Sequence, residues 1–252
     1  IANENNIITI GVINVVDSLI ARETDCGIYC NSGIEVGVAS TKSFVSQVVC
    51  MSLISLWFSE KHKTEENLRK KVIKSLRNLS NDITRTLENV EPMITPNLPD
   101  LNLLTINSMF ILGKGCDAFI SNEGALKIKE LTYIHSEGYS ASALKHGPFA
   151  LLTEDTPVIL LNCDKTYSSK IMNCYEEVSS RNAPVLLITD NSDIMENMEK
   201  KEKNLIITVT NNEYYGFILG LIPLQLLSYY IALNKGYNPD TPRNLAKVVT
   251  VE

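Results

Sequence analysis

Short apolar runs open the chain, and longer apolar segments with helical spacing follow them. Two runs, Ile7–Ile13 and Cys26–Cys30, have the length and composition of buried strands. The apolar segment Thr41–Ser59 predicts a helix. Charged residues then become frequent from Glu60 onward, and a helical pattern continues to Glu91, where three prolines within eight residues interrupt it. We therefore predict a domain boundary close to residue 100.

Beyond residue 100, apolar strand patterns alternate with helical ones. The predicted strands are Ser108–Leu112, Val158–Asn162, Val185–Thr189 and Leu205–Val209. The predicted helices are Ser121–Tyr133, Ser168–Arg181, Asp193–Lys200 and Tyr215–Asn234. This alternation is typical of a doubly wound parallel sheet that has helices on both faces.

The two halves of the chain end in the same order of elements. In each half a strand ends in asparagine, a short loop follows, and an apolar helix carries a central glutamine, Gln47 or Gln225. The repeat predicts two copies of one α/β unit, the first lacking its beginning. We expect an α/β fold of tandem, doubly wound parallel sheets. The expected boundaries are 1–59 for the end of the first subdomain, 60–100 for a helical linker, and 101–252 for the second subdomain and its tail.

Composition narrows the range of partners. The 252 residues carry a formal net charge of −6, which argues against nucleic acid and against an anionic membrane surface. A small phosphorylated metabolite is still compatible, because it needs only a few N–H groups and one or two cations. Two apolar stretches, Phe44–Phe58 and Phe217–Leu233, are interrupted by polar residues and fall short of a clean span of about 20 residues. We expect them to be buried core helices.

The six cysteines include no Cys-x-x-Cys pair and no histidine at metal-ligand spacing. We therefore predict no metal site. We interpret the cysteines as reduced, mostly buried thiols, which suits a cytoplasmic protein.

The densest group of chemically useful side chains is Glu123, Lys127 and Glu130, spaced i, i+4 and i+7 on one helical face. Such a group is commonly a solvated stripe of intrahelical ion pairs. The segment Leu144–Pro148 favours a functional role for this group. Its Gly-Pro pair ends a helix abruptly and displays His146 at the helix terminus. A helix-capping histidine is the alternative.

Together these side chains could isomerise a sugar. A carboxylate can move a proton between adjacent carbons, and an imidazole can open a hemiketal ring. A lysine can stabilise an oxyanion or form an imine. Spacing alone does not assign these roles.

Two further segments have the composition of ligand contacts. Small residues in Val36–Phe44 precede a helix start at Ser40 or Thr41, where N–H groups and hydroxyls can bind a phosphorylated or hydroxylated ligand, although a plain N-cap would look the same. The tail Asn238–Glu252 has two prolines and a lone lysine, Lys247, before a β-branched run. We expect this tail to pack against the protein, whereas most C-terminal segments are poorly ordered.

These segments resemble, in order along the whole chain, the sugar-isomerase (SIS) subdomains of the glucosamine-6-phosphate synthase family, the glutamine–fructose-6-phosphate aminotransferases (isomerizing). Ser32–Lys42 resembles the loop-to-helix segment of the first subdomain. Leu112–Gly115, Glu123–His135 and Leu144–Pro148 resemble the core of the second, and Pro242–Glu252 resembles the C-terminal decapeptide.

The resemblance implies roles for individual residues. Glu130 is the implied base between C1 and C2, with Lys127 beside it and Glu123 and Lys114 near the substrate. His146 is implied to assist ring opening in the neighbouring subunit of a homodimer. Lys247 is implied to engage the open-chain ketose. Val38, Ser40 and Ala246 match sugar-contacting positions, and Lys114 stands where relatives commonly have arginine.

The implied reaction converts fructose 6-phosphate to glucosamine 6-phosphate with ammonia from glutamine and without a metal or organic cofactor. The family's Ser/Thr-rich phosphate loop and its glutaminase domain have no counterpart in this sequence. We expect them upstream of Ile1 and expect little activity from this segment alone. Two alternatives are a non-catalytic SIS module that binds sugar phosphates and a phosphosugar deaminase-isomerase without glutaminase.

Overall fold

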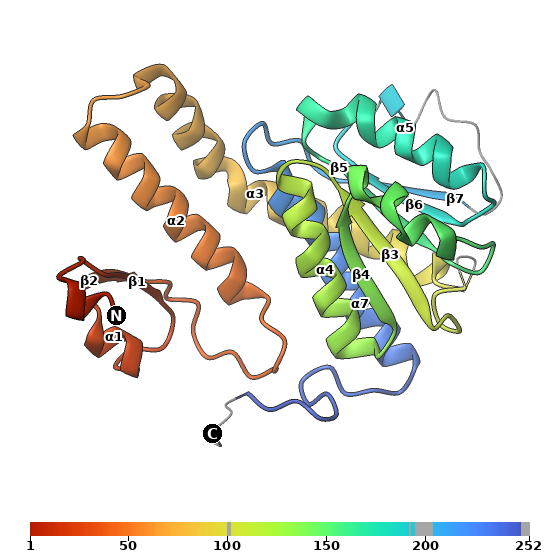
Figure 1. Ribbon diagram of the computed structural model, residues 1–252, viewed down its shortest axis with the longest axis horizontal. Coiled ribbons are helices and arrows are strands. Elements are labelled where there is room, and N and C mark those ends of the chain that lie inside the picture. The colour runs from red at the N-terminus through yellow and green to blue at the C-terminus, as the bar shows by residue number, and fades with distance from the viewer. Residues whose placement is uncertain (100–101, 192, 195–203, 248–252) are drawn as a thin grey trace. The chain divides into compact units, whose positions relative to one another are not determined.

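A computed structural model describes residues 1–99, 102–191, 193–194 and 204–247. The chain divides into two compact units. Unit 1 comprises Ile1–Leu76 together with Asn244–Glu252, and unit 2 comprises Arg77–Arg243. Figure 1 traces the elements of both.

Unit 2 contains a five-stranded sheet in the order β4-β3-β5-β6-β7, and every pairing in it is parallel. The strands are β3 (Ser108–Gly113), β4 (His135–Ser140), β5 (Val158–Asn162), β6 (Val185–Thr189) and β7 (Asn204–Thr208). The four strands predicted from apolar runs are all present. Strand β4 was not predicted, because its residues His-Ser-Glu-Gly-Tyr-Ser form no apolar run. It pairs only with β3, at one edge of the sheet, and its side chains are only partly buried, so a polar sequence is tolerated there.

Helices cover both faces of this sheet. On one face Phe110, Leu112 and Leu160 share a buried cluster with Ile171 and Val178 of α5 (Ser168–Ser179). On the other face α4 (Cys116–Thr132) packs beside α7 (Gly216–Asn234), as Figure 1 shows. The doubly wound α/β arrangement predicted from the sequence is confirmed. The predicted helix Asp193–Lys200 lies mostly outside the described residues.

The predicted interruption of the helix after Glu91 was wrong. Helix α3 (Glu66–Asn97) continues through Pro92 and Pro96. Each proline removes one helical hydrogen bond. Buried side chains on the same stretch offset that loss, since Val90 and Ile94 are at most 1% exposed. Burying such a side chain contributes about 1.5–3 kcal/mol.

Unit 1 has a two-stranded parallel sheet of β1 (Ile10–Ile13) and β2 (Cys26–Tyr29), with the short helix α1 (Leu19–Glu23) between them. Helix α2 (Lys42–Lys61) follows.

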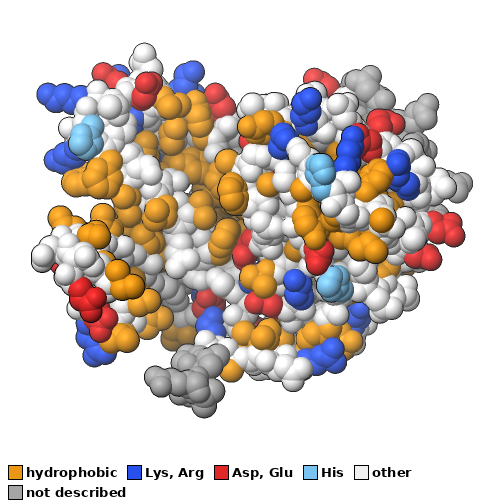
Figure 2. All heavy atoms as spheres, in the orientation of Figure 1, with side chains coloured by type: hydrophobic (Ala, Val, Ile, Leu, Met, Phe, Trp, Pro, Cys, Tyr) orange, Lys and Arg blue, Asp and Glu red, His pale blue; other side chains and the backbone are white. Residues whose placement is uncertain are grey.

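The expectation that both long apolar segments are buried was wrong for α2. Of the helices in the described residues, α2 and α7 are long and apolar enough to cross a membrane, which is weak evidence by itself. The apolar window of α7 is 67% buried and that of α2 only 11%. Met51, Leu53, Trp57 and Phe58 of α2 are exposed, and hydrophobic side chains are visible along this part of the surface in Figure 2.

The cysteines are free, and three of them are buried: Cys50, Cys163 and Cys174. Cys26 and Cys116 are exposed, so the expectation of mostly buried thiols holds for only half of them.

The expected boundaries 1–59, 60–100 and 101–252 stay a prediction, and the two compact units are defined by their own contacts. The division between the units falls inside α3, because the first part of this helix packs with unit 1. The tail from Asn244 groups with unit 1. Its Lys247 Nζ donates to Gly37 O at 2.7 Å, which ties it there.

Replacing Gly124 by alanine tests the packing of α4 on α7. Helix propensity alone would stabilise the variant by about 1 kcal/mol. The added Cβ, however, would overlap Leu224 Cδ1 and lie 3.2 Å from Leu224 Cβ, and overpacking costs about 1–3 kcal/mol. We expect Gly124→Ala to lower the free energy of unfolding in urea. A stabilised variant would contradict this close packing.

Candidate functional site

The face of α4 that carries Glu123, Lys127 and Glu130 is buried rather than solvated. Lys127 Nζ lies 2.8 Å from Glu130 Oε2 and 3.5 Å from Glu123 Oε1. The Lys127 side chain is 3% exposed, and the carboxylate side chains are 14% and 20% exposed. The predicted shared face is confirmed, and the solvated-stripe alternative does not fit these exposures.

Burial disfavours the charged forms of these three side chains. It raises the pKa of Glu123, against the opposing effect of Lys127, and the nearby Glu130 raises it further. Desolvating ions costs several kcal/mol each, and their attraction rarely repays the whole cost. One ammonium between two carboxylates also leaves a net negative charge. Such an arrangement is typical of sites where a carboxylate has a chemical task.

A second group of predicted residues gathers in unit 1 around Glu35. The Glu35 carboxylate accepts hydrogen bonds from Thr41 N at 3.0 Å and Ser43 Oγ at 2.7 Å, at the start of α2. It also accepts one from Lys247 Nζ at 3.3 Å. Burial would raise the pKa of Glu35, but these donors together lower it to about 2.

The predicted sugar-contacting residues adjoin this carboxylate. Val38 and Ser40 lie in the loop between Glu35 and α2, where Ser40 Oγ is 2.6 Å from Ser43 Oγ. Ala246 is exposed next to Lys247. Glu35 was not among the predicted site residues. The available signal was a single acidic residue shortly before a helix start, where a carboxylate suits the N-terminal end of a helix dipole.

His146 lies at the last position of a 3-10 helix, Ala141–His146, and is exposed. Helix α5 and the residue just after it, Arg181, contact the segment on both sides of His146. Lys145 Nζ is 2.6 Å from Glu177 Oε1, and the Arg181 guanidinium lies 3.8 Å from the centre of the Phe149 ring. The imidazole is therefore displayed on a supported turn, as the Gly-Pro stop predicted.

Within unit 2, His146 and Lys114 lie toward the opposite end of α4 from Glu130. Lys114 precedes α4 and donates to Ser142 Oγ, in the turn that carries His146. Between Cys116 and Glu130 a helix rises about 20 Å. The structure thus brings Glu123, Lys127 and Glu130 together but does not bring Lys114 or the chain's own His146 to them.

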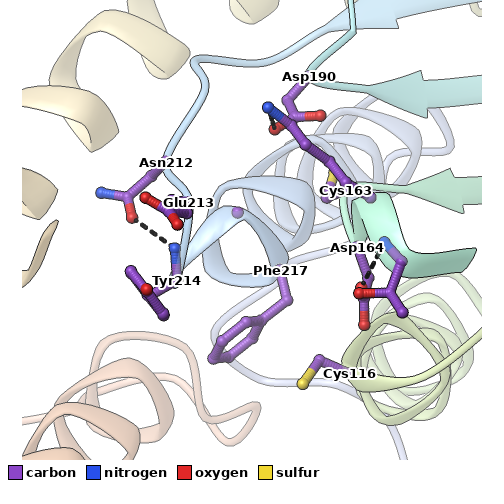
Figure 3. A pocket seen from close by; sticks show the side chains of 11 residues that line it. Cys116, Cys163, Asp164, Asp190, Asn212, Glu213, Tyr214 and Phe217 are labelled. Atoms are coloured by element: carbon purple, nitrogen blue, oxygen red, sulfur yellow. Dashed lines mark hydrogen bonds and ion pairs between the residues drawn. The ribbon is translucent and has the colours of Figure 1, made fainter. Parts of the chain in front are cut away.

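A cavity of about 420 Å³ opens at the carboxyl ends of β5 and β6 (Figure 3). Its lining includes Asp164, Asp190 and Glu213 but one lysine, Lys165. Figure 3 shows the Phe217 ring between Tyr214 and Cys116. The acidic lining disfavours an isolated phosphate.

Asp117 holds the loop beside this cavity in place. Its side chain is buried, and Oδ2 accepts hydrogen bonds from Cys163 N at 2.8 Å and Asp164 N at 2.9 Å. Burial raises the pKa of Asp117 to about 6, although these two donors oppose the shift. Among the described residues, no group of three or more His, Cys, Asp or Glu side chains could hold a metal ion.

Comparison with known proteins identifies the family. The SIS domain model matches residues 1–56 and 102–235. The chain belongs to the SIS family. Both matched segments fall on the parallel-sheet regions described above, and the second includes all of α4 and the His146 turn.

Within the SIS family, the chain is similar to two glutamine–fructose-6-phosphate aminotransferases (isomerizing). It is 40% identical over 247 residues to human isoform 2, covering 97% of this chain and 35% of the relative. It is 40% identical over 255 residues to the protein of Chlorobaculum tepidum, covering 100% of this chain and 40% of the relative. The chain therefore spans less than half the length of these relatives.

A solved SIS structure is similar along nearly the whole chain. The C-terminal domain of glucosamine-fructose-6-phosphate aminotransferase from Francisella tularensis superposes with a TM-score of 0.88 at 28% identity. The match covers 96% of this chain and 68% of that one.

Replacing Asp117 by asparagine tests the electrostatic cost of its burial. Because the folded pKa of about 6 exceeds the ordinary 3.8, the folded state loses stability as pH rises through this window. The free energy of unfolding of Asp117→Asn, relative to that of the unsubstituted protein, should therefore increase between pH 4 and pH 8 by up to about 3 kcal/mol. Urea unfolding at both pH values measures it.

Asp155→Asn, at an exposed aspartate, serves as the matched control. If Asp117→Asn changed the free energy of unfolding by the same amount at both pH values, burial would not raise the pKa of Asp117.

Proposed function

We propose that this chain forms the isomerase part of a glutamine–fructose-6-phosphate aminotransferase, which makes glucosamine 6-phosphate. The observation that carries the proposal is Lys127 buried between Glu123 and Glu130 on α4, in a chain 40% identical along its length to enzymes of that name. The proposed substrates are fructose 6-phosphate and ammonia released from glutamine. The glutaminase domain belongs to the full-length protein, and we place that protein in the cytoplasm.

The proposed chemistry needs one proton shuttle. Ammonia condenses with the C2 carbonyl of the open-chain sugar, and water leaves to give an imine. Glu130 takes the proton from C1, which forms an enolamine, and a proton is then delivered to C2. The C1 hydroxyl becomes the aldehyde as the imine becomes an amine, so the step is a redox-neutral isomerisation. A carboxylate held by a neighbouring ammonium suits such a transfer.

Lys127 and Lys247 have different proposed tasks. Lys127 fixes the Glu130 carboxylate at 2.8 Å and offsets its charge. Lys247, with 40% of its side chain exposed, engages the open-chain ketose. Glu35 holds the tail lysine next to the loop that carries Val38 and Ser40. Ala246 and these loop residues complete the proposed sugar contacts.

His146 is proposed to act in the site of a second copy of the chain. Its exposure, and its position toward the opposite end of α4 from Glu130, support a role across a subunit boundary. A homodimer is therefore part of the proposal.

A non-catalytic module that only binds sugar phosphates is the alternative from another class. Binding alone does not require a buried ammonium between two carboxylates, which costs several kcal/mol in desolvation. A deaminase-isomerase without a glutaminase domain would use the same isomerase residues. Glutamine-dependent product formation by the full-length protein distinguishes it.

Glu130→Gln tests the base. In the full-length protein we expect glucosamine 6-phosphate formation to fall by at least about 100-fold, the scale of general base catalysis, while binding of fructose 6-phosphate is nearly unchanged. Glu88→Gln, on an exposed part of α3, is the matched control. Near-normal turnover by Glu130→Gln would remove it from the base role.

Co-expression of Glu130→Gln and His146→Ala subunits tests the shared site. Random pairing makes half of the dimers mixed, and each mixed dimer has one site with both groups intact. We expect about one quarter of wild-type activity from two inactive parents. Absence of any rescue would place both groups in one subunit's site.

A further inference from the structure

The ends of α4 and α7 meet in a small aromatic cluster that no step of the proposed reaction uses. Helix α7 ends with Gly236 in the left-handed conformation, at φ 73°. Gly236 N donates to Leu233 O at 3.0 Å and Tyr237 N to Ala232 O at 2.9 Å, which is a Schellman end. This turn brings the Tyr237 ring to 4.7 Å from the Tyr133 ring.

Tyr133 is the residue at which α4 ends, and it too is left-handed, at φ 61°. A tyrosine in this conformation is uncommon and costs about 1–2 kcal/mol. Its side chain holds one residue by two contacts. The hydroxyl accepts a hydrogen bond from Arg243 N at 2.8 Å, and the Arg243 guanidinium lies 4.1 Å from the centre of the ring.

The positions of these contacts along the chain give them a consequence. Tyr133 follows Glu130 by three residues, and Arg243 precedes Lys247 by four. With Arg243 held, four residues of extended chain limit Lys247 to within about 14 Å of it. Without this anchor the last of these contacts with α4 and α7 would be at Tyr237, and the ten residues from there to Lys247 could reach about 34 Å.

We propose that Tyr133 is a positioning residue for Lys247. It fixes the start of the C-terminal tail to the end of the helix that carries the base, so that the tail lysine is presented to the sugar from a fixed point. This inference rests on the proposed function. The Tyr237 ring packs against the Tyr133 ring, and Arg243 is the residue that Tyr133 holds.

The test is a set of variants in the full-length protein, assayed with fructose 6-phosphate and glutamine. Tyr133→Phe keeps the ring and removes the hydroxyl, so we expect kcat to fall about fivefold, the value of one hydrogen bond. Arg243→Gln removes the cation over the ring and should cost about threefold. Tyr133→Leu removes both contacts and should cost about 15-fold. Tyr229→Phe, at a tyrosine 43% exposed on α7, is the matched control and should leave kcat unchanged.

Combination with Lys247→Ala separates positioning from a general structural effect. If Tyr133 acts through Lys247, Tyr133→Phe should cause no further loss in a Lys247→Ala background. Amide hydrogen exchange of Arg243 should also become faster in Tyr133→Phe. The same fivefold loss in both backgrounds would overturn the positioning role and leave the proposed function standing.

Two other results would overturn the positioning role. One is wild-type kcat in both Tyr133→Phe and Tyr133→Leu. The other is full activity of Lys247→Ala, which would remove Lys247 from the reaction and count against the proposed function as well.

Discussion

The proposed activity depends on one electrostatic arrangement, the Lys127 ammonium between the carboxylates of Glu123 and Glu130. It is buried, so water does little to screen it, and the three side chains hold one another in place at 2.8 and 3.5 Å. A buried ion group of this kind is a poor way to stabilise a helix. It is a good way to keep a carboxylate oriented beside a carbon acid, because the neighbouring ammonium fixes its rotamer and offsets its charge.

Within each unit, contacts between distant segments hold the other proposed site residues. The parallel sheet and α7 hold α4, whose last turn carries Glu130. In unit 1, Glu35 gathers the start of α2 and the tail lysine around one carboxylate. The contacts of Tyr133 with Arg243 hold the start of the tail on α4. Each of these contacts lies within one compact unit, the Glu35 contacts in unit 1 and the Tyr133 contacts in unit 2.

Apolar pattern predicted the apolar strands, including the edge strand β7 and the largely exposed β1 and β2, and it missed the polar strand β4. The runs Val158–Asn162 and Val185–Thr189 are central strands and were recognised at once. Strand β4 is polar and pairs on one edge only, so it gave no signal. Helix α2 has the composition of a core helix but is mostly exposed in this chain, because composition does not report what packs against a helix.

The candidate site was partly predictable for the same reason. Helical spacing placed Glu123, Lys127 and Glu130 on one face, but spacing cannot tell a buried face from a solvated one, and burial is what distinguishes this group. The role of Glu35 and the clamp at Tyr133 depend on contacts between residues more than 100 positions apart, such as that of Tyr133 with Arg243. No local pattern contains them.

A crystal structure of the full-length protein with fructose 6-phosphate bound tests the central claim most directly. The account predicts one sugar molecule whose C1 and C2 lie about 3 Å from the Glu130 carboxylate, with Lys247 at the C2 oxygen of the same molecule. A sugar bound only in the acidic cavity at the ends of β5 and β6, or Glu130 and Lys247 on separate surfaces without a shared ligand, would contradict it.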